Sequence, residues 1–203
     1  MRFTTPAIVL AVRIHGETGA IARMLTPNHG LVACYVRGAR GRRMRPVLVA
    51  GNEVEARLSA RTDAQLPQAE VELTHSRAPL MTEPLPAAGI LWATTLTAEV
   101  LPERQPYPAL YQGLSGLLDA IAAAPSASGW GPALFAYELL VLAELGFGLD
   151  PADVRKASVD WPTGLALTGR RIRRDLLQRP GDPAWDARER LTARLRRALG
   201  LVA

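Results

Sequence analysis

The sequence predicts an α+β protein in which an N-terminal five-stranded OB-fold barrel precedes an α-helical domain. Two observations lead to this prediction: apolar residues recur at every second position in the first 77 residues, and at helical spacing in most of the remainder. With 203 residues, 48% of them hydrophobic and 21% charged, the chain is long enough to bury a sizeable core. The N-terminus alternates apolar and polar residues and no apolar run reaches the length of a membrane span, so we expect neither a secretory signal nor a membrane helix.

Short alternating segments predict the strands of the barrel. The expected strands are Ala7–Ile14, Ala20–Leu25, Leu31–Val36, Glu53–Leu58 and Ala69–Thr74. Four apolar residues of the first strand are expected to share one face: Ile8, Leu10, Val12 and Ile14. A turn sequence, Thr26–Gly30, joins the second strand to the third. Five short strands in about 75 residues fit a small barrel, and the OB-fold is the common nucleic-acid-binding barrel of that size.

Helices are expected after a proline-rich boundary at Arg77–Pro86. The predicted helices are Ala87–Leu101, Ala109–Ala124, Pro132–Gly146 and Asp186–Leu199. Pro132 is expected in the first turn of its helix, where a proline has no hydrogen bond to lose. Between the last two helices, Val159–Leu167 resembles a β-hairpin that turns at Pro162-Thr163-Gly164. The expected divisions are a barrel (1–77), a helical domain (78–148), and a hairpin insertion with a C-terminal helix that packs on the helical domain (149–203).

The net charge of +5 is unevenly distributed along the chain. Residues 1–77 contain 11 arginines and 6 acidic residues, and residues 78–148 contain one arginine and 6 acidic residues. Residues 149–203 contain 12 basic and 7 acidic residues. This asymmetry indicates basic ends that bind a polyanion and an acidic middle with a different partner.

The segment Tyr35–Pro46, YVRGARGRRMRP, is the strongest candidate binding site. It contains five arginines, interrupted by two glycines: Arg37, Arg40, Arg42, Arg43 and Arg45. Glycines let the backbone follow an irregular phosphate chain, and each guanidinium can bind a phosphate through two hydrogen bonds. Five close charges repel one another, and bound phosphates relieve that repulsion. The alternative interpretation is a solvated turn in an arginine-rich protein.

A second basic cluster follows the expected hairpin and completes the candidate DNA-binding set: Arg170, Arg171, Arg173 and Arg174. This cluster either extends the phosphate-binding surface of the first five arginines or is a solvated face that binds no ligand. Aromatic residues are scarce in the barrel segment, which contains only Phe3 and Tyr35. OB-folds that bind single strands tightly commonly stack bases on aromatic residues. The scarcity of aromatic residues therefore predicts binding mainly through the nucleic-acid backbone, which is sensitive to salt and indifferent to base sequence.

Catalytic and metal-binding motifs are absent from the sequence. Three histidines and a single cysteine do not have metal-ligand spacing: His15, His29, His75 and Cys34. There is neither a phosphate-binding glycine loop followed by lysine nor a Gly-x-Ser-x-Gly elbow. We therefore expect no cofactor, no metal and no enzyme activity, and the lack of a disulfide framework favours a cytoplasmic protein.

Several short motifs in a defined order resemble the RecO family of bacterial recombination mediators. They are Gly16-Glu17, Thr26-Pro27-Asn28-His29-Gly30, Gly38-Ala39-Arg40 with its basic continuation, and Phe135-x-x-Glu138-Leu139-Leu140-x-Leu142-x-x-Leu145-Gly146. The resemblance covers essentially the whole chain. It implies an OB-fold followed by a helical domain, binding of single- and double-stranded DNA, and annealing of complementary strands. It also implies that the five arginines after the third strand belong to the DNA-binding surface.

The resemblance further implies partners and a location. With RecR, proteins of this family help RecA to replace single-stranded DNA-binding protein on single strands, and their helical domain accepts the acidic tail of that protein. Such proteins work in the bacterial cytoplasm, at the nucleoid. Many members have four cysteines in a zinc-binding insertion after the position of Gly146. Because Phe147–Arg174 contains no cysteine, this chain is expected to bind no zinc there.

Two other functions are compatible with the sequence. The first is a protein-interaction scaffold whose helical domain docks a partner and whose barrel binds nucleic acid only weakly. The second is binding of RNA in place of DNA, since nothing in the sequence distinguishes a 2′-hydroxyl.

Overall fold

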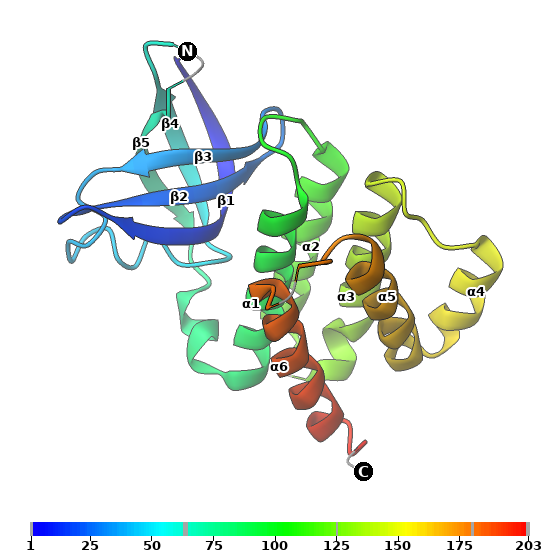
Figure 1. Cartoon of the computed structure of the whole chain (residues 1–203). Coiled ribbons are helices and arrows are strands. Elements are labelled where there is room, and N and C mark those ends of the chain that lie inside the picture. The colour runs from blue at the N-terminus through cyan, green and yellow to red at the C-terminus, as the bar shows by residue number, and fades with distance from the viewer. Residues whose placement is uncertain (1, 63–64, 125, 180, 202–203) are drawn as a thin grey trace.

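The computed structural model describes residues 2–62, 65–124, 126–179 and 181–201. Within these residues five strands form a barrel, and a bundle of helices lies beside it (Figure 1). The strands are β1 (Arg2–His15), β2 (Gly19–Thr26), β3 (Gly30–Val36), β4 (Glu53–Ser59) and β5 (Gln68–His75). The predicted fold class, an OB-fold barrel followed by helices, is confirmed, and each predicted strand lies within an observed one.

The barrel closes in the strand order β1-β2-β3-β5-β4. Neighbouring strands are antiparallel except β3 and β5, which run parallel and are joined only through Tyr35 and Val36 of β3. Side chains alternate between the core and solvent: Val54 and Ala56 of β4 are buried, whereas Glu55 between them is exposed. The period-two pattern of the sequence is thus the signature of a barrel with a small apolar interior.

A β-bulge in β1 changes the face on which its apolar residues lie. The register with β2 shifts around Leu10. Ile8 and Leu10 are buried against the helices, whereas Val12 and Ile14 pair with alanines of β2 that belong to the barrel core. Val12 and Ile14 are 38% and 65% exposed, because the β1–β2 hairpin extends beyond that core. The prediction that these four residues share one face is therefore wrong: a bulge adds one residue to one strand and reverses the alternation beyond it.

In the described residues, six α-helices and one 3-10 turn follow the barrel. They are η1 (Ala78–Thr82), α1 (Pro84–Val100), α2 (Pro108–Ala123), α3 (Ala127–Glu144), α4 (Pro151–Val159), α5 (Trp161–Asp175) and α6 (Pro183–Ala198). Helix α1 packs against α6, α2 and β1, while α3 packs against α2 and α5. No described helix combines the length and the apolar character that a membrane crossing requires.

Helix α3 begins at Ala127, so Pro132 lies inside the helix and not in its first turn, as the sequence suggested. The indole of Trp130 is fully buried in the bundle, and this burial stabilises a further turn of helix ahead of the proline. Packing therefore outweighs the single hydrogen bond that a proline removes within a helix.

The predicted hairpin at Val159–Leu167 is wrong, because these residues end α4 and begin α5. Proline in the first turn is favourable for a helix, and Pro162 occupies such a position. Gly164 does not make a turn; it lets α5 approach α3, since a β-carbon there would lie 2.8 Å from the ring of Phe135. The Pro-Thr-Gly sequence that resembled a turn is thus a helix start followed by a close helix contact.

The turn at Thr26–Gly30 fastens the barrel to the helices. The hydroxyl of Thr26 donates to the carbonyl of Gly30 (3.0 Å) and accepts from the amide of His29 (3.1 Å). Gly30 has a φ of 66° and lies so close to the backbone of Gln105 that a β-carbon would overlap it. Glycine is therefore required both for the backbone conformation and for the contact with the connection between α1 and α2.

Candidate nucleic-acid interface

The arginine loop, defined here as residues 37–45, is anchored to the barrel. Ala39 is buried and Met44 partly buried against the barrel core. The amide of Arg40 donates to the carbonyl of Thr18 (3.3 Å), and its guanidinium donates to the carbonyl of Glu17 (2.9 Å), so the loop is tied to the β1–β2 turn. The loop backbone therefore follows a defined path although it contains two glycines.

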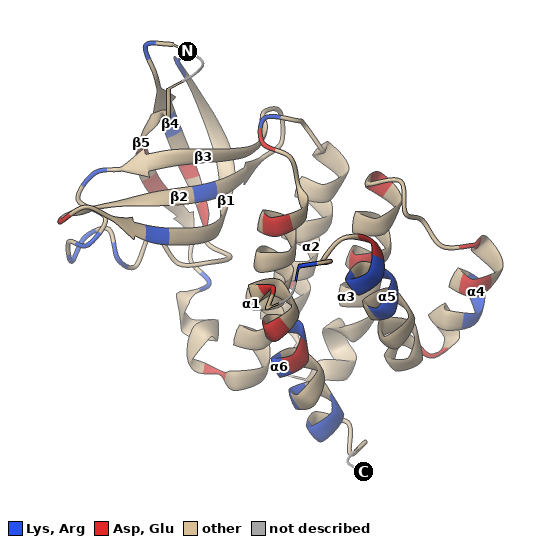
Figure 2. Cartoon of the chain, in the orientation of Figure 1, with Lys and Arg blue, Asp and Glu red and all other residues tan. Residues whose placement is uncertain are grey.

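The cations of the arginine loop face solvent, and none of them is paired with an acidic side chain that the structure describes. All five side chains are exposed: Arg37, Arg40, Arg42, Arg43 and Arg45. No carboxylate in the described part of the chain forms an ion pair with any of them. Figure 2 shows basic positions gathered in this loop, at the edge of the barrel away from the helices. Among the described residues no carboxylate therefore offsets their mutual repulsion, and a polyanion would remove it.

A hollow of about 800 Å³ lies beside the arginine loop, against β3, β4 and β5. Arg37 and Arg43 of the loop line it, together with Arg2 of β1 and Arg57 of β4. Arg57 is paired with Glu70 at 3.3 Å. The sequence reasoning missed Arg2 and Arg57 because both are isolated in the chain, and only strand pairing brings them beside the loop.

The outer surface of the barrel differs in charge from one pair of strands to another. Arg13 of β1 and Arg23 of β2 lie on one outer face and were also missed, because single cations in alternating strands give no local pattern. On the outer face of β4 and β5, Glu55 lies directly opposite Glu72, and both are exposed. Figure 2 shows blue positions on β1 and β2 and mostly red positions on β4 and β5, where the exposed Arg57 of β4 adds a cation. Such a field steers a polyanion toward the first face.

The second basic cluster lies on α5 and is partly neutralised. Asp175 pairs with Arg174 at 2.9 Å and with Arg171 at 2.6 Å. The hydrogen bond from Arg174, together with the two positive charges, lowers the pKa of the Asp175 carboxyl. Arg173 lies over the ring of Trp185, 4.5 Å from its centroid, and Arg170 is exposed. Helix α5 is on the far side of α1 and α2 from the barrel (Figure 1), so the structure does not bring this cluster to the arginine loop.

An apolar groove of about 540 Å³ lies between α5 and α6. Its apolar lining includes Trp161 and Leu165 of α5 and Leu195 of α6. Two exposed arginines, Arg170 and Arg196, line the α5–α6 groove as well. The sequence does not predict this groove, because the residues that begin α5 resemble a hairpin and not a helix. An apolar groove with cations in its lining fits a peptide that combines acidic and apolar residues.

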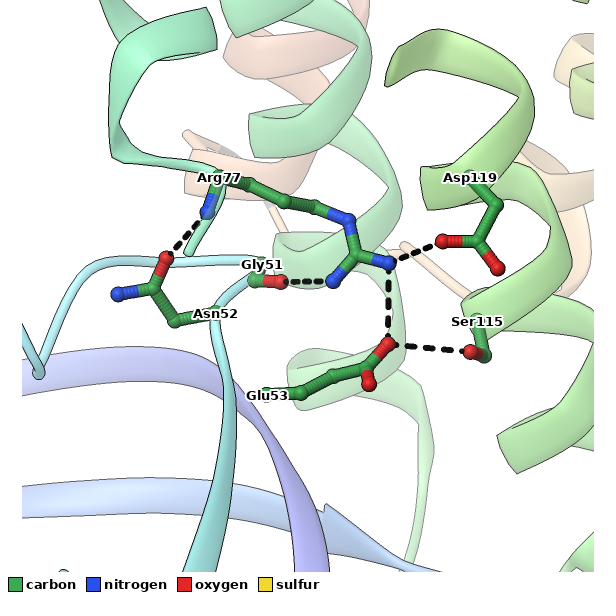
Figure 3. Close-up of polar contacts among 6 residues, drawn as sticks. All are labelled: Gly51, Asn52, Glu53, Arg77, Ser115 and Asp119. Atoms are coloured by element: carbon green, nitrogen blue, oxygen red, sulfur yellow. Dashed lines mark hydrogen bonds and ion pairs between the residues drawn. The ribbon is translucent and has the colours of Figure 1, made fainter. Parts of the chain in front are cut away.

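A buried arginine joins the barrel to the helices (Figure 3). The side chain of Arg77 is 1% exposed, and its guanidinium donates to the carbonyl of Gly51 at 3.0 Å. It also donates to the carboxylates of Glu53 (2.9 Å) and of Asp119 in α2 (2.5 Å). The amide of Arg77 donates to the side chain of Asn52 (2.8 Å). One side chain thus binds β4 and α2 together, which fixes the orientation of the barrel on the helices.

No group of three or more histidine, cysteine or acidic side chains that could hold a metal ion occurs among the described residues. Cys34 lies in the barrel core, where burial raises the pKa of its thiol to about 12. A thiol in this state is protonated at neutral pH and is a poor nucleophile, so Cys34 fills space in the core.

Two family models match the chain. The model described as "Recombination protein O N terminal" matches residues 1–77, and the model described as "Recombination protein O C terminal" matches residues 82–153. The first match contains the whole barrel with the arginine loop, and the second contains α1, α2 and α3.

Several bacterial proteins are similar to the chain over most of its length. A protein named DNA repair protein RecO from Rhodospirillum centenum is 38% identical over 187 residues, which are 92% of this chain and 73% of the relative. The protein of the same name from Phenylobacterium zucineum is 37% identical over 92% of this chain and 75% of its own length. Another from a Bradyrhizobium strain is 43% identical over 74% of this chain and 59% of the relative.

Proposed function

The chain belongs to the RecO family, and from this premise we propose that it is a DNA-binding mediator of recombinational repair that anneals complementary strands. The names of its relatives support a role in DNA repair. We assign DNA binding to the barrel (1–77) and partner contacts to the helical domain (78–148) with the following segment (149–203). The proposed location is the bacterial cytoplasm, at the nucleoid.

The observation that supports this proposal most strongly is the arginine loop itself. Its five guanidinium groups are exposed, lack carboxylate partners among the described residues, and project from a backbone that is fastened to the barrel. Each phosphate that they neutralise lowers the repulsion between two DNA strands, which allows complementary bases to meet. This mechanism needs neither nucleotide hydrolysis nor a bound metal, so we propose that the protein is a mediator and not an enzyme.

A strand-annealing assay tests this function directly. Complementary oligonucleotides labelled with a donor and an acceptor dye are expected to anneal faster with the protein than without it, in buffer that contains EDTA and no ATP. The variant Arg42→Ala/Arg43→Ala/Arg45→Ala is expected to lose most of the acceleration, because it lacks three of the five loop cations. A strict requirement for ATP or for a divalent metal would refute the mechanism.

The proposed partners are RecR, single-stranded DNA-binding protein and, indirectly, RecA. We place the acidic tail of the single-stranded DNA-binding protein in the α5–α6 groove, where Arg170 and Arg196 would bind its carboxylates and the apolar lining would bind its hydrophobic residues. Of the four arginines on α5, Arg170 is thereby assigned to this groove. The direct DNA contacts of Arg171, Arg173 and Arg174 stay a prediction.

A labelled peptide of that acidic tail tests the placement. Arg170→Glu/Arg196→Glu is expected to weaken peptide binding at least tenfold, because it replaces attraction by repulsion at the groove. The control is Arg42→Glu/Arg43→Glu, which makes the same charge change at the arginine loop and is expected to leave peptide binding largely unchanged. If both variants lost the same peptide affinity, the loss would come from the change in net charge, and the peptide would not bind in the groove.

The alternative function is a protein-interaction scaffold, and the α5–α6 groove is the observation that favours it. Fluorescence anisotropy of labelled single-stranded DNA at two salt concentrations separates the two functions. Binding at low salt that weakens at high salt supports the DNA mediator, whereas no binding at low salt supports the scaffold. Competition between DNA and RNA oligonucleotides in the same titration decides between the two nucleic acids.

A further inference from the structure

The outer face of β1, β2 and β3 is only partly covered by the helices. The covered part is apolar and includes Ile8, Leu25 and Leu31. Farther along the strands, pairing aligns Arg13, Ile21 and Tyr35 in one row across the three strands. His15 and Gly19 form the next pair toward the β1–β2 turn. Because directly paired residues project from the same face of a sheet, these side chains form one surface.

The phenol ring of Tyr35 lies over Gly19 of the neighbouring strand. A β-carbon at residue 19 would overlap three atoms of the Tyr35 side chain: Oη, Cζ and Cε2. Gly19 is not among the glycines with positive φ, so its backbone conformation does not require glycine. The ring of His15 stands edge-on to Tyr35, with 6.2 Å between ring centroids and 83° between ring planes. Gly19 and His15 thus hold the Tyr35 ring in place across the surface of β2.

Tyr35 keeps part of its ring accessible and has cations near it. The side chain is half-buried, and it lines the same hollow as Arg37 and Arg43 of the arginine loop. On the side away from the hollow, Tyr35 lies in the same cross-strand row as the exposed Arg13 of β1. Arg23 of β2 lies on the same face, two residues farther along β2 from the β1–β2 turn than Ile21. The Nε of Arg23 is buried and has no hydrogen-bond partner within the described chain. A partly exposed aromatic ring therefore lies between two groups of cations.

We propose that Tyr35 is a stacking platform for one unpaired base of a single strand. The phosphates of that strand would lie on Arg37 and Arg43 on one side and on Arg13 and Arg23 on the other. Base stacking on aromatic rings is tolerant of base identity, since every base has a π-face. In a duplex the faces of the bases are covered by their neighbours, so the platform favours single strands over duplexes. This inference rests on the proposed DNA binding. It adds one contact to a base, whereas the scarcity of aromatic residues in the barrel predicts contacts to the backbone alone.

Two substitutions remove the platform in different ways. Tyr35→Ala deletes the ring, whereas Gly19→Ala keeps every aromatic and charged group but places a methyl group where the ring lies. The matched controls are Tyr35→Phe, which keeps the ring, and Gly116→Ala in α2, whose β-carbon would meet no atom within 4 Å. Affinities are measured by anisotropy at two salt concentrations with a labelled single strand, a duplex of the same sequence, and an abasic strand of the same length.

Both Tyr35→Ala and Gly19→Ala are expected to weaken single-strand binding about tenfold, within the range for loss of one stacked base. The duplex affinity and the salt dependence are expected to stay unchanged, which also shows that the variants are folded. Tyr35→Phe and Gly116→Ala are expected to bind like the original protein. The abasic strand is expected to bind the original protein as weakly as the natural strand binds Tyr35→Ala.

Three results would overturn the platform: an undiminished single-strand affinity in Tyr35→Ala, an equal loss on single strand and duplex, or no penalty for the abasic strand. These results are distinct from failure of the proposed function. In that case the original protein would bind neither single strand nor duplex at low salt, and the platform would fall with it.

Discussion

At Arg77 a single guanidinium is shared between Glu53 of β4 and Asp119 of α2, whereas the arginines of the loop have no acidic partner in the described chain. Ser115 of α2 donates to the same carboxylate of Glu53 at 3.2 Å, so the acceptor is itself held in place. Burial explains the difference between the two kinds of arginine. A cation removed from water must be paired, but an exposed cation keeps its hydration until a ligand replaces it.

Removal of the Arg77 side chain is expected to destabilise the protein strongly. Arg77→Ala is expected to lower the free energy of unfolding by about 3 kcal/mol, because it removes several buried hydrogen bonds and leaves Glu53 without its cation. The control is Arg57→Ala, which breaks an ion pair whose side chains are 60% and 82% exposed and is expected to cost less than about 1 kcal/mol. Urea unfolding followed by tryptophan fluorescence measures both. Equal losses would show that Arg77 is not the joint between barrel and helices.

Little of this pairing could be predicted from the sequence. The partners of Arg77 are 24 and 42 residues away in the chain, and in the sequence it is one arginine at the edge of a proline-rich segment. The arginine loop was predictable because its cations are consecutive in a single exposed segment. Arg2, Arg13 and Arg23 were not, because strand pairing determines their neighbours.

Among the elements, α3 is connected to three other helices through one carboxylate. Glu138 is fully buried and accepts hydrogen bonds from Trp92 of α1 (2.7 Å), from Thr168 of α5 and from Arg188 of α6. This explains why a glutamate stands in the apolar run that resembles the RecO family. A buried carboxylate with this many donors is stable only if all of them are present, so it specifies how the four helices meet.

Close packing at Gly164 provides a test of the α5 assignment. Gly164→Ala is expected to lower the free energy of unfolding by about 1–3 kcal/mol, because the new methyl group would lie 2.8 Å from the ring of Phe135. The control Gly116→Ala adds the same group to an open position of α2 and is expected to stabilise by up to about 1 kcal/mol. Thermal unfolding followed by circular dichroism compares the two variants. A stabilised Gly164→Ala would contradict the helix contact.

The strands and most helices were predictable because their patterns repeat locally, every two residues or at helical spacing. The failures occurred where a distant contact decides the structure. Around Gly164, residues with turn-like composition form a helix. The glycine lets α5 pack closely against Phe135 of α3, and this distant contact is not visible in the local sequence. In β1, the bulge at Leu10 leaves no mark in the alternation of apolar residues, so the change of face could not be read from it.

At the scale of the whole molecule, the cationic surface and the α5–α6 groove lie on different parts of the protein. The arginine loop is at the edge of the barrel away from the helices, and α5 lies beyond α1 and α2 (Figure 1). A DNA strand bound to the barrel, as proposed, would therefore leave the groove accessible to a peptide. Arg77 joins the barrel to α2, and α5 and α6 pack on α3 and α1 of the same bundle, so a protein tail bound in the groove would remain at a defined position relative to a bound strand.

The salt dependence of single-strand binding tests the central claim most directly, namely that the arginine loop neutralises phosphates. Arg42→Ala/Arg43→Ala/Arg45→Ala is compared with Arg155→Ala/Arg190→Ala/Arg197→Ala, which removes the same charge from exposed helical positions. The loop variant is expected to flatten the slope of log affinity against log salt by about 2, at about 0.7 for each lost phosphate contact, and the helix variant is expected to keep the original slope. An unchanged slope in the loop variant, or the same change in both variants, would contradict the account.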